Sequence, residues 1–190
     1  MRTVVLAGGR SQRMGFDKLT ALFAGEPLAR RVARGLAELE PVFVATPRVA
    51  DVIADLRGVR VVVTKPTAGP SETLALAHAA IPLDLHLAVL ACDLPFVDAE
   101  RLRAFVARVP DDADLAWPVV DGTPGHPVIW SPKARTRIPA LRGDEPPLRV
   151  RRDPALRVVA LDERDDTYVT DVDTPEAWAA AEGRATPDRR

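Results

Sequence analysis

The sequence contains little of what several classes of protein require. Cys92 is its only cysteine, which excludes an internal disulfide and a metal site built from several thiolates. Its 26 basic and 27 acidic residues leave a formal net charge of −1. Because this balance creates no global positive field, we expect neither nucleic acid nor an anionic membrane as a partner.

Long apolar segments are also missing. The first apolar stretch ends at Gly8, which is too short for the core of a signal peptide, and no run approaches the length of a transmembrane helix. We therefore expect a cytoplasmic protein. The 190 residues, of which 47% are hydrophobic, predict a single domain over residues 1–182 with a flexible tail at 183–190. Frequent prolines divide this domain into a part at about 1–110 and a part at 111–182.

The order of hydrophobic patterns indicates an α/β fold. Runs of β-branched residues alternate with amphipathic stretches, such as the one in which Leu28, Val32 and Leu36 recur at helical spacing. The expected strands are Thr3–Leu6, Val42–Thr46, Val59–Val63, Leu87–Ala91, Leu115–Val120 and Arg157–Leu161. Ligands of such sheets bind beyond the carboxyl ends of the strands, so residues after Leu6 and after Ala91 are expected to face one crevice.

A basic, glycine-rich loop follows the first expected strand. It reads Leu6-Ala7-Gly8-Gly9-Arg10-Ser11-Gln12-Arg13-Met14-Gly15-Phe16-Asp17-Lys18. Glycines let successive backbone amides approach an anion closely, and the basic side chains can neutralise a triphosphate and a departing pyrophosphate. The loop therefore predicts a polyphosphate site, although its spacing matches neither the P-loop nor G-x-G-x-x-G. The alternative is a glycine-rich turn with solvated basic residues. The candidate nucleotide-binding residues here are Leu6, Ala7, Gly8, Gly9, Arg10, Ser11, Arg13, Gly15 and Lys18.

Carboxylates that could hold a metal follow two extended segments. Asp93 comes directly after the apolar run Leu87–Ala91, where its side chain can project into the expected crevice. Magnesium prefers oxygen ligands and often bridges substrate phosphates through one or two carboxylates. The alternative is that Asp93 only fixes the turn before Pro95. Asp171 and Asp173 lie two apart, so both can point to one side of an extended chain, and Asp173 could instead cap the following helix.

Four segments together resemble the MobA-like nucleotidyltransferases, a family that includes molybdenum cofactor guanylyltransferase and its cytidylyltransferase relative. Besides the loop, these are Cys92-Asp93-Leu94-Pro95-Phe96-Val97, Gly125-His126-Pro127-Val128 and Thr170-Asp171-Val172-Asp173-Thr174-Pro175-Glu176. The resemblance implies a Rossmann-like three-layer α/β/α fold with a mostly parallel central sheet. It also implies transfer of a nucleoside monophosphate from a magnesium-bound triphosphate to a phosphorylated pterin-type acceptor.

The same resemblance suggests roles for particular residues. It makes Arg13, Lys18 and Asp93 the catalytic candidates and favours Asp171 over Asp173 as the second metal ligand. Ser71 and Thr73 occupy the segment that reads base and ribose, although Ser71 could equally cap a helix. Gly125 and His126 belong to the acceptor motif, with a structural histidine as the alternative.

The identity of the nucleotide stays open at this point. Gly8-Gly9 and Asp17-Lys18 look more like the guanylyl branch, whereas the segment from Tyr168 to Glu176 looks more like the cytidylyl branch. We therefore favour GTP, with CTP or transfer to another phosphorylated metabolite as alternatives. A non-catalytic nucleotide-binding regulator or assembly partner is the alternative from a different class, although such a protein need not keep a metal carboxylate.

Overall fold

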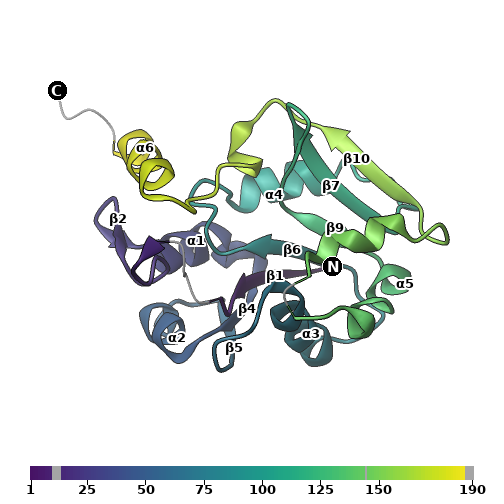
Figure 1. The fold of residues 1–190 in the computed structure, drawn as a ribbon, viewed down its shortest axis with the longest axis horizontal. Coiled ribbons are helices and arrows are strands. Elements are labelled where there is room, and N and C mark those ends of the chain that lie inside the picture. Colours follow the sequence, from purple (N-terminus) through teal and green to yellow (C-terminus); the bar gives the residue numbers. More distant parts are fainter. Residues whose placement is uncertain (10–13, 144, 187–190) are drawn as a thin grey trace.

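Eight strands of this protein form one mixed sheet in the order β10-β7-β9-β6-β1-β4-β5, with β8 paired to β7 (Figure 1). The computed structural model describes residues 1–9, 14–143 and 145–186. The strand bounds are β1 Arg2–Ala7, β4 Val42–Ala45, β5 Arg60–Val63, β6 Leu87–Ala91, β7 Leu115–Val120, β8 Thr123–Pro124, β9 Val128–Trp130 and β10 Val158–Asp162. Each expected strand begins and ends within about one residue of an observed strand, which is the usual uncertainty of such bounds.

The sheet is mostly parallel. β1 pairs in parallel with β4 and β6, β4 with β5, and β7 with β10, whereas β9 runs antiparallel between β6 and β7. The sequence did not predict β9, which is short and lies between Pro127 and Pro132. Because β7, β9 and β10 belong to the same sheet as β1 and β6, the second half of the chain extends the sheet that the first half forms.

Helices cover both faces of this sheet. Their bounds are α1 Leu28–Leu36, α2 Pro47–Ile53, α3 Pro70–Ala80, α4 Ala99–Val106, α5 Pro132–Arg135 and α6 Pro175–Ala185. Short 3₁₀ helices lie at η2 Ala37–Leu39, η3 Ile138–Ala140, η4 Pro147–Arg152 and η5 Asp166–Tyr168, and a small hairpin is formed by β2 Leu22–Phe23 and β3 Glu26–Pro27.

Alternation along the strands separates two apolar cores. Val5 and Phe43 pack in one core with side chains of α1, α2 and α4. Val4 and Val44, the neighbours on the opposite face, pack in the other core with α3 and α5. This alternation is the period of two that a strand imposes on its side chains. The fold is therefore the expected three-layer α/β/α arrangement.

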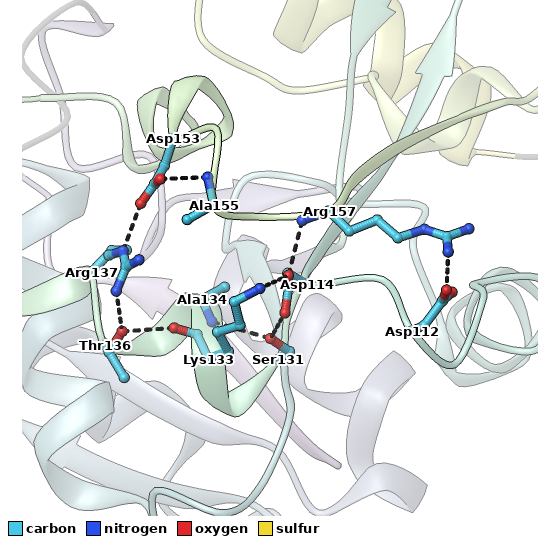
Figure 2. A network of polar contacts seen from close by, with 10 residues as sticks. All are labelled: Asp112, Asp114, Ser131, Lys133, Ala134, Thr136, Arg137, Asp153, Ala155 and Arg157. Carbon is cyan, nitrogen blue, oxygen red and sulfur yellow. Dashed lines mark hydrogen bonds and ion pairs between the residues drawn. The ribbon is translucent and has the colours of Figure 1, made fainter.

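A polar network around Asp114, which precedes β7, connects the strands β7, β9 and β10 with α5 (Figure 2). Its carboxylate accepts hydrogen bonds from Ser131 Oγ at 3.0 Å, Lys133 Nζ at 2.8 Å and the backbone N of Arg157 at 2.9 Å. These donors come from the end of β9, from α5 and from the start of β10. One carboxylate thus connects three elements of the part formed by residues 111–182.

The carboxyl-terminal helix α6 packs on the β2–β3 hairpin, so segments from the two ends of the chain meet (Figure 1). The rings of Trp178 and Phe23 lie 5.2 Å apart in an edge arrangement, and Glu182 accepts a hydrogen bond from the backbone N of Ala24 at 2.8 Å. Gly183, which we expected at the start of a tail, lies inside α6. In the described part of the chain, no helix combines the length and apolar character needed to cross a bilayer.

Candidate active site

The carboxyl ends of β1 and β6 open onto one cavity of about 1150 Å³. The two strands are parallel neighbours with Leu6 opposite Ala91, and the backbone N of Cys92 donates to the carbonyl O of Leu6 at 3.1 Å. Gly8 and Gly9 continue from one strand and Asp93 from the other, and all three line the cavity. The glycine-rich segment and the acidic strand end are therefore adjacent in space.

Lys18 lies between two carboxylates of this cavity. Its Nζ donates to Asp93 Oδ2 at 2.7 Å and also donates to Asp173 Oδ1. Burial by itself lowers the pKa of Lys18, but the charge of Asp93 and the hydrogen bonds to both aspartates outweigh burial and raise the pKa above its ordinary value. Lys18, a residue that is only 7% exposed, is thus held as a charged ammonium.

The structure places Asp173, and not the favoured Asp171, in the cavity. Asp173 lines the cavity beside Lys18, whereas Asp171 is exposed and is absent from the described lining. Thr174 caps α6 by accepting from the backbone N of Ala177 at 3.2 Å. The helix cap that was the alternative role for Asp173 is therefore supplied by its neighbour, and the Asp173 carboxylate pairs with Lys18.

Gly8 packs closely against the start of α3. A Cβ atom added at Gly8 would lie 2.9 Å from Thr73 Oγ1 and 3.2 Å from two atoms of Thr67. The carbonyl O of Gly8 accepts from the backbone N of Thr67 at 2.9 Å and from its hydroxyl at 3.1 Å. A side chain at this position would separate the loop from the helix, so glycine is required here by close approach.

The hydroxyls of Ser71 and Thr73 already have partners within the protein. Thr73 lines the cavity, and its Oγ1 lies 2.7 Å from Thr67 Oγ1 and donates to the carbonyl O of Gly69 at 3.1 Å. Ser71 is buried and donates to the carbonyl O of Glu145 at 2.6 Å. Gly69 occupies the N-cap position of α3, so the alternative in which Ser71 caps this helix is wrong. Ser71 instead links α3 to the segment around residue 145.

The acceptor-side motif forms another part of the cavity wall. A Cβ atom at Gly125 would lie 2.4 Å from the carbonyl O of Tyr168, so this glycine permits a close contact between two chain segments. His126 Nδ1 lies 3.2 Å from the carbonyl O of Val89 and must carry the proton of that hydrogen bond, which leaves Nε2 as an acceptor. Burial lowers the pKa of His126, and the bond to Val89 and the charge of Asp93 offset burial only in part.

Several wall residues were missed by the sequence analysis. They are apolar residues or prolines, and they come from β9 and from the start of η4 with the residue before it: Val128, Trp130, Pro146, Pro147 and Leu148. Val128 and Trp130 share one strand face because they lie two residues apart. This spacing was the available signal, but it could be used only after β9 itself had been recognised.

The remaining predicted residues lie in different places. Leu6 lines the cavity, whereas Ala7 is buried and Gly15 adopts a positive φ of 72°, and neither belongs to the described lining. Arg10, Ser11 and Arg13 fall outside the described residues.

Cys92 lines the cavity, but burial and then the charge of Asp93 raise the pKa of its thiol far above the ordinary value. A neutral buried thiol is a poor nucleophile.

The two cavity carboxylates fit one divalent cation. Asp93 Oδ1 is buried and has no hydrogen-bond partner among the described residues, which is the unmet requirement that a cation would satisfy. In the same part of the chain, no group of three or more His, Cys, Asp and Glu side chains is arranged to hold a metal ion. Magnesium needs no such group when substrate phosphates and water complete its coordination.

The fold and this cavity define a three-layer α/β/α domain whose candidate site lies at the carboxyl ends of β1 and β6. Over residues 3–175 the chain matches the family described as MobA-like NTP transferase domain, and it belongs to that family. It is 35% identical over 134 residues to a molybdenum cofactor guanylyltransferase from Rhizobium leguminosarum bv. trifolii, a match that covers 67% of this chain and 61% of the relative. The chain thus spans about three-fifths of the length of that curated relative.

Solved structures share the same fold. Molybdopterin-guanine dinucleotide biosynthesis protein A from Archaeoglobus fulgidus superposes with a TM-score of 0.75 at 20% identity, over 97% of this chain and 98% of that one. A Mycobacterium tuberculosis protein solved in complex with manganese gives a TM-score of 0.75 at 21% identity, over 96% and 97% of the two chains. At these identities the likeness concerns the fold alone.

Proposed function

We propose that this chain is a nucleotidyltransferase that moves GMP from GTP to a molybdopterin-type phosphate and releases pyrophosphate. One observation carries the proposal: Lys18, Asp93 and Asp173 meet in the cavity that Gly8 and Gly9 border. The names of the curated relatives support the guanylyl branch. The apolar wall formed by Trp130, Pro147 and Leu148 offers a surface for a flat acceptor ring.

The reaction needs no covalent intermediate on the protein. An oxygen of the acceptor phosphate attacks the α-phosphorus of the nucleotide, the new P–O bond forms, and the bond to the bridging oxygen breaks so that pyrophosphate leaves with its electrons. The main task of the site is to position two anions and to stabilise spread negative charge. Lys18 supplies a fixed positive charge for this purpose.

Asp93 and Asp173 are the residues that would hold the divalent cation. Magnesium is the ion we propose, and the manganese complex of a fold relative supports a divalent ion in general. When bound, such a cation neutralises phosphate charge. The backbone N–H groups of Gly8 and Gly9, which border the cavity, would donate to phosphate oxygens beside it.

A single assay tests the proposal. Pyrophosphate release is measured for ATP, GTP, CTP and UTP, each with magnesium or manganese, and with molybdopterin or simpler phosphorylated acceptors. We expect release with GTP that depends on both the cation and the acceptor. Preference for CTP would replace the guanylyl assignment with the cytidylyl one. Nucleotide binding without release in any combination would favour the non-catalytic binder.

A further inference from the structure

A second cavity, of about 420 Å³, lies among α1, the loop before α4, η5 and α6. Four arginines line it: Arg31, Arg34, Arg101 and Arg184. We call it the arginine cavity. Within the described residues it shares no lining residue with the active-site cavity, and nothing in the proposed transfer reaction uses it.

The charges at its wall are paired. Glu26 pairs with Arg31 and Arg34, Asp165 with Arg101, and Asp166 with Arg184, and the one acidic side chain among the described lining residues is Asp98. That carboxylate already accepts from the backbone N of Arg101 at 2.9 Å and from the Arg101 guanidinium at 2.6 Å. Asp98 is therefore engaged by Arg101 at the start of α4.

The arginines keep many hydrogen-bond donors. Arg34 bonds Glu26 through one terminal nitrogen, and Arg184 bonds Asp166 through one at 2.8 Å. Each guanidinium carries five N–H donors in a fixed fork, so most donors of both groups have no partner among the described residues. Such forks match the oxygens of a phosphate group in geometry and charge.

Two of the guanidinium groups are also held in place. Arg184 Cζ lies 4.6 Å from the centre of the Phe96 ring, and Arg31 Nε donates to the carbonyl O of Pro95 at 3.1 Å. Stacking and hydrogen bonding restrict these long side chains before any ligand arrives, which reduces the entropy lost on binding.

A buried hydroxyl provides an independent sign of an unmet partner. Thr167 lines the same cavity and is 1% exposed, and its Oγ1 has no hydrogen-bond partner among the described residues. Buried hydroxyls usually have a partner. The volume of the cavity falls within the range of small-molecule pockets.

We propose that the arginine cavity is a second anion site, which binds a small phosphate-bearing molecule. Its loop wall, Pro95 to Asp98, begins two residues after Asp93. A phosphate held there contacts the loop that positions the metal carboxylate. The phosphate group can belong to inorganic phosphate, to pyrophosphate or to a nucleoside monophosphate.

Amide chemical shifts of the whole chain test this site directly. Inorganic phosphate, pyrophosphate and GMP are titrated separately. The ligand that binds most tightly identifies the kind of molecule that supplies the phosphate group. We expect the amides of Gly35, Phe96 and Ala185 to shift with a dissociation constant of about 1 mM or tighter. The Lys18→Met variant should keep these shifts, because the arginine cavity is separate from the active site.

Variants of the wall supply the decisive comparison. Arg34→Gln combined with Arg184→Gln should weaken binding about tenfold or more, whereas Arg103→Gln, which changes an α4 arginine paired with Glu38 outside the cavity, should leave it unchanged. The single variant Arg34→Gln, expected to weaken binding about threefold, serves if the double variant loses its fold. Equal affinities in wild type and variants, shifts confined to Gly8 and Gly69, or no shift with any of the three ligands would overturn the proposal.

Discussion

Lys18 and Asp93 are 75 positions apart in sequence, yet the Lys18 ammonium donates to the Asp93 carboxylate at 2.7 Å. Both side chains are largely shielded from water, with exposed fractions of 9% and 18%. Ion pairs in such places cost free energy to desolvate, and they are weak evidence for a stabilising role. Together with Asp173, these two side chains form the centre of the binding site that we propose.

The first prediction concerns these charges. Lys18→Ala and Asp93→Ala should each lower turnover about tenfold or more, a loss of about 1.4 kcal/mol in transition-state stabilisation. Lys133→Ala and Asp51→Ala are matched controls, because Lys133 pairs with a carboxylate outside the cavity and Asp51 is exposed on α2. Pyrophosphate release is the measurement. Unchanged rates in both site variants would refute the assignment of the site.

The two neighbouring aspartates provide a sharper comparison. Asp173→Asn should lower activity about tenfold or more and weaken the dependence on magnesium, since one cation ligand becomes neutral. Asp171→Asn should change activity less than about twofold, because Asp171 is exposed outside the described cavity lining. Rates measured across a magnesium titration separate the two cases. The reverse order of effects would restore Asp171 as the metal-side residue.

The difference between Asp171 and Asp173 illustrates what the sequence could predict. Local patterns were sufficient for the strands, because buried runs such as Leu87–Ala91 carry their own signal. The choice between the two aspartates depended on which neighbour caps α6, and both Asp173 and Thr174 are good capping residues. Only the position of Lys18, 155 positions earlier, decides that choice.

Polar groups in the site posed the same difficulty. A hydroxyl such as that of Ser71 can serve a ligand or the protein, and its bond to the carbonyl O of Glu145 joins segments that no local pattern connects. Trp130 was missed for a related reason, since β9 is a short strand recognisable mainly by its pairing with β6 and β7. Long-range pairing therefore set the limit of the sequence analysis.

The third prediction uses two adjacent glycines. Gly8→Ala should destabilise the fold by about 1 to 3 kcal/mol, because its Cβ would lie 2.9 Å from Thr73 Oγ1 in a packed interior. Gly9→Ala should change stability by less than about 0.5 kcal/mol, since a Cβ atom there meets nothing within 4 Å. Urea unfolding of both variants measures the difference. Equal midpoints would show that the loop can move away from α3 without cost.

The fourth prediction concerns acid stability. Burial alone raises the pKa of Asp114, but hydrogen bonds from Lys133, from the backbone of Arg157 and from Ser131 outweigh it and lower the pKa below its ordinary value. A carboxyl with a lowered folded-state pKa stabilises the protein above the unfolded-state pKa of about 3.9. That contribution is lost as the pH falls through the folded-state pKa.

Asp114→Asn should therefore be less stable than wild type at pH 7, by about 1 to 3 kcal/mol, and the difference should shrink below about pH 4. Denaturant unfolding at several pH values measures it, with Asp51→Asn, an exposed α2 residue, as the control. A difference that stayed constant down to acid pH would mean that the network of Figure 2 acts through packing and not through charge.

The fifth prediction concerns Arg135, a fully buried cation on α5. Its guanidinium donates to the carbonyl O atoms of Pro82, Leu85 and Ile81, at 2.6, 2.5 and 2.9 Å. These carbonyls follow the carboxyl end of α3, where helix carbonyls lack partners of their own. Burial lowers the pKa of Arg135, but an arginine stays charged at neutral pH.

Arg135→Met keeps most of the buried volume but removes every one of these donors. We expect a loss of about 3 kcal/mol in the free energy of unfolding, because one buried and two partly buried carbonyls lose a charged donor and each such loss costs about 1 kcal/mol. Arg137→Met is the matched control: Arg137 pairs with Asp153 at 2.7 Å in a more exposed place, and such pairs contribute about 1 kcal/mol or less. Urea unfolding at pH 7 measures both variants. Nearly equal midpoints would mean that water replaces the guanidinium, and that the carboxyl end of α3 does not depend on Arg135 for its position.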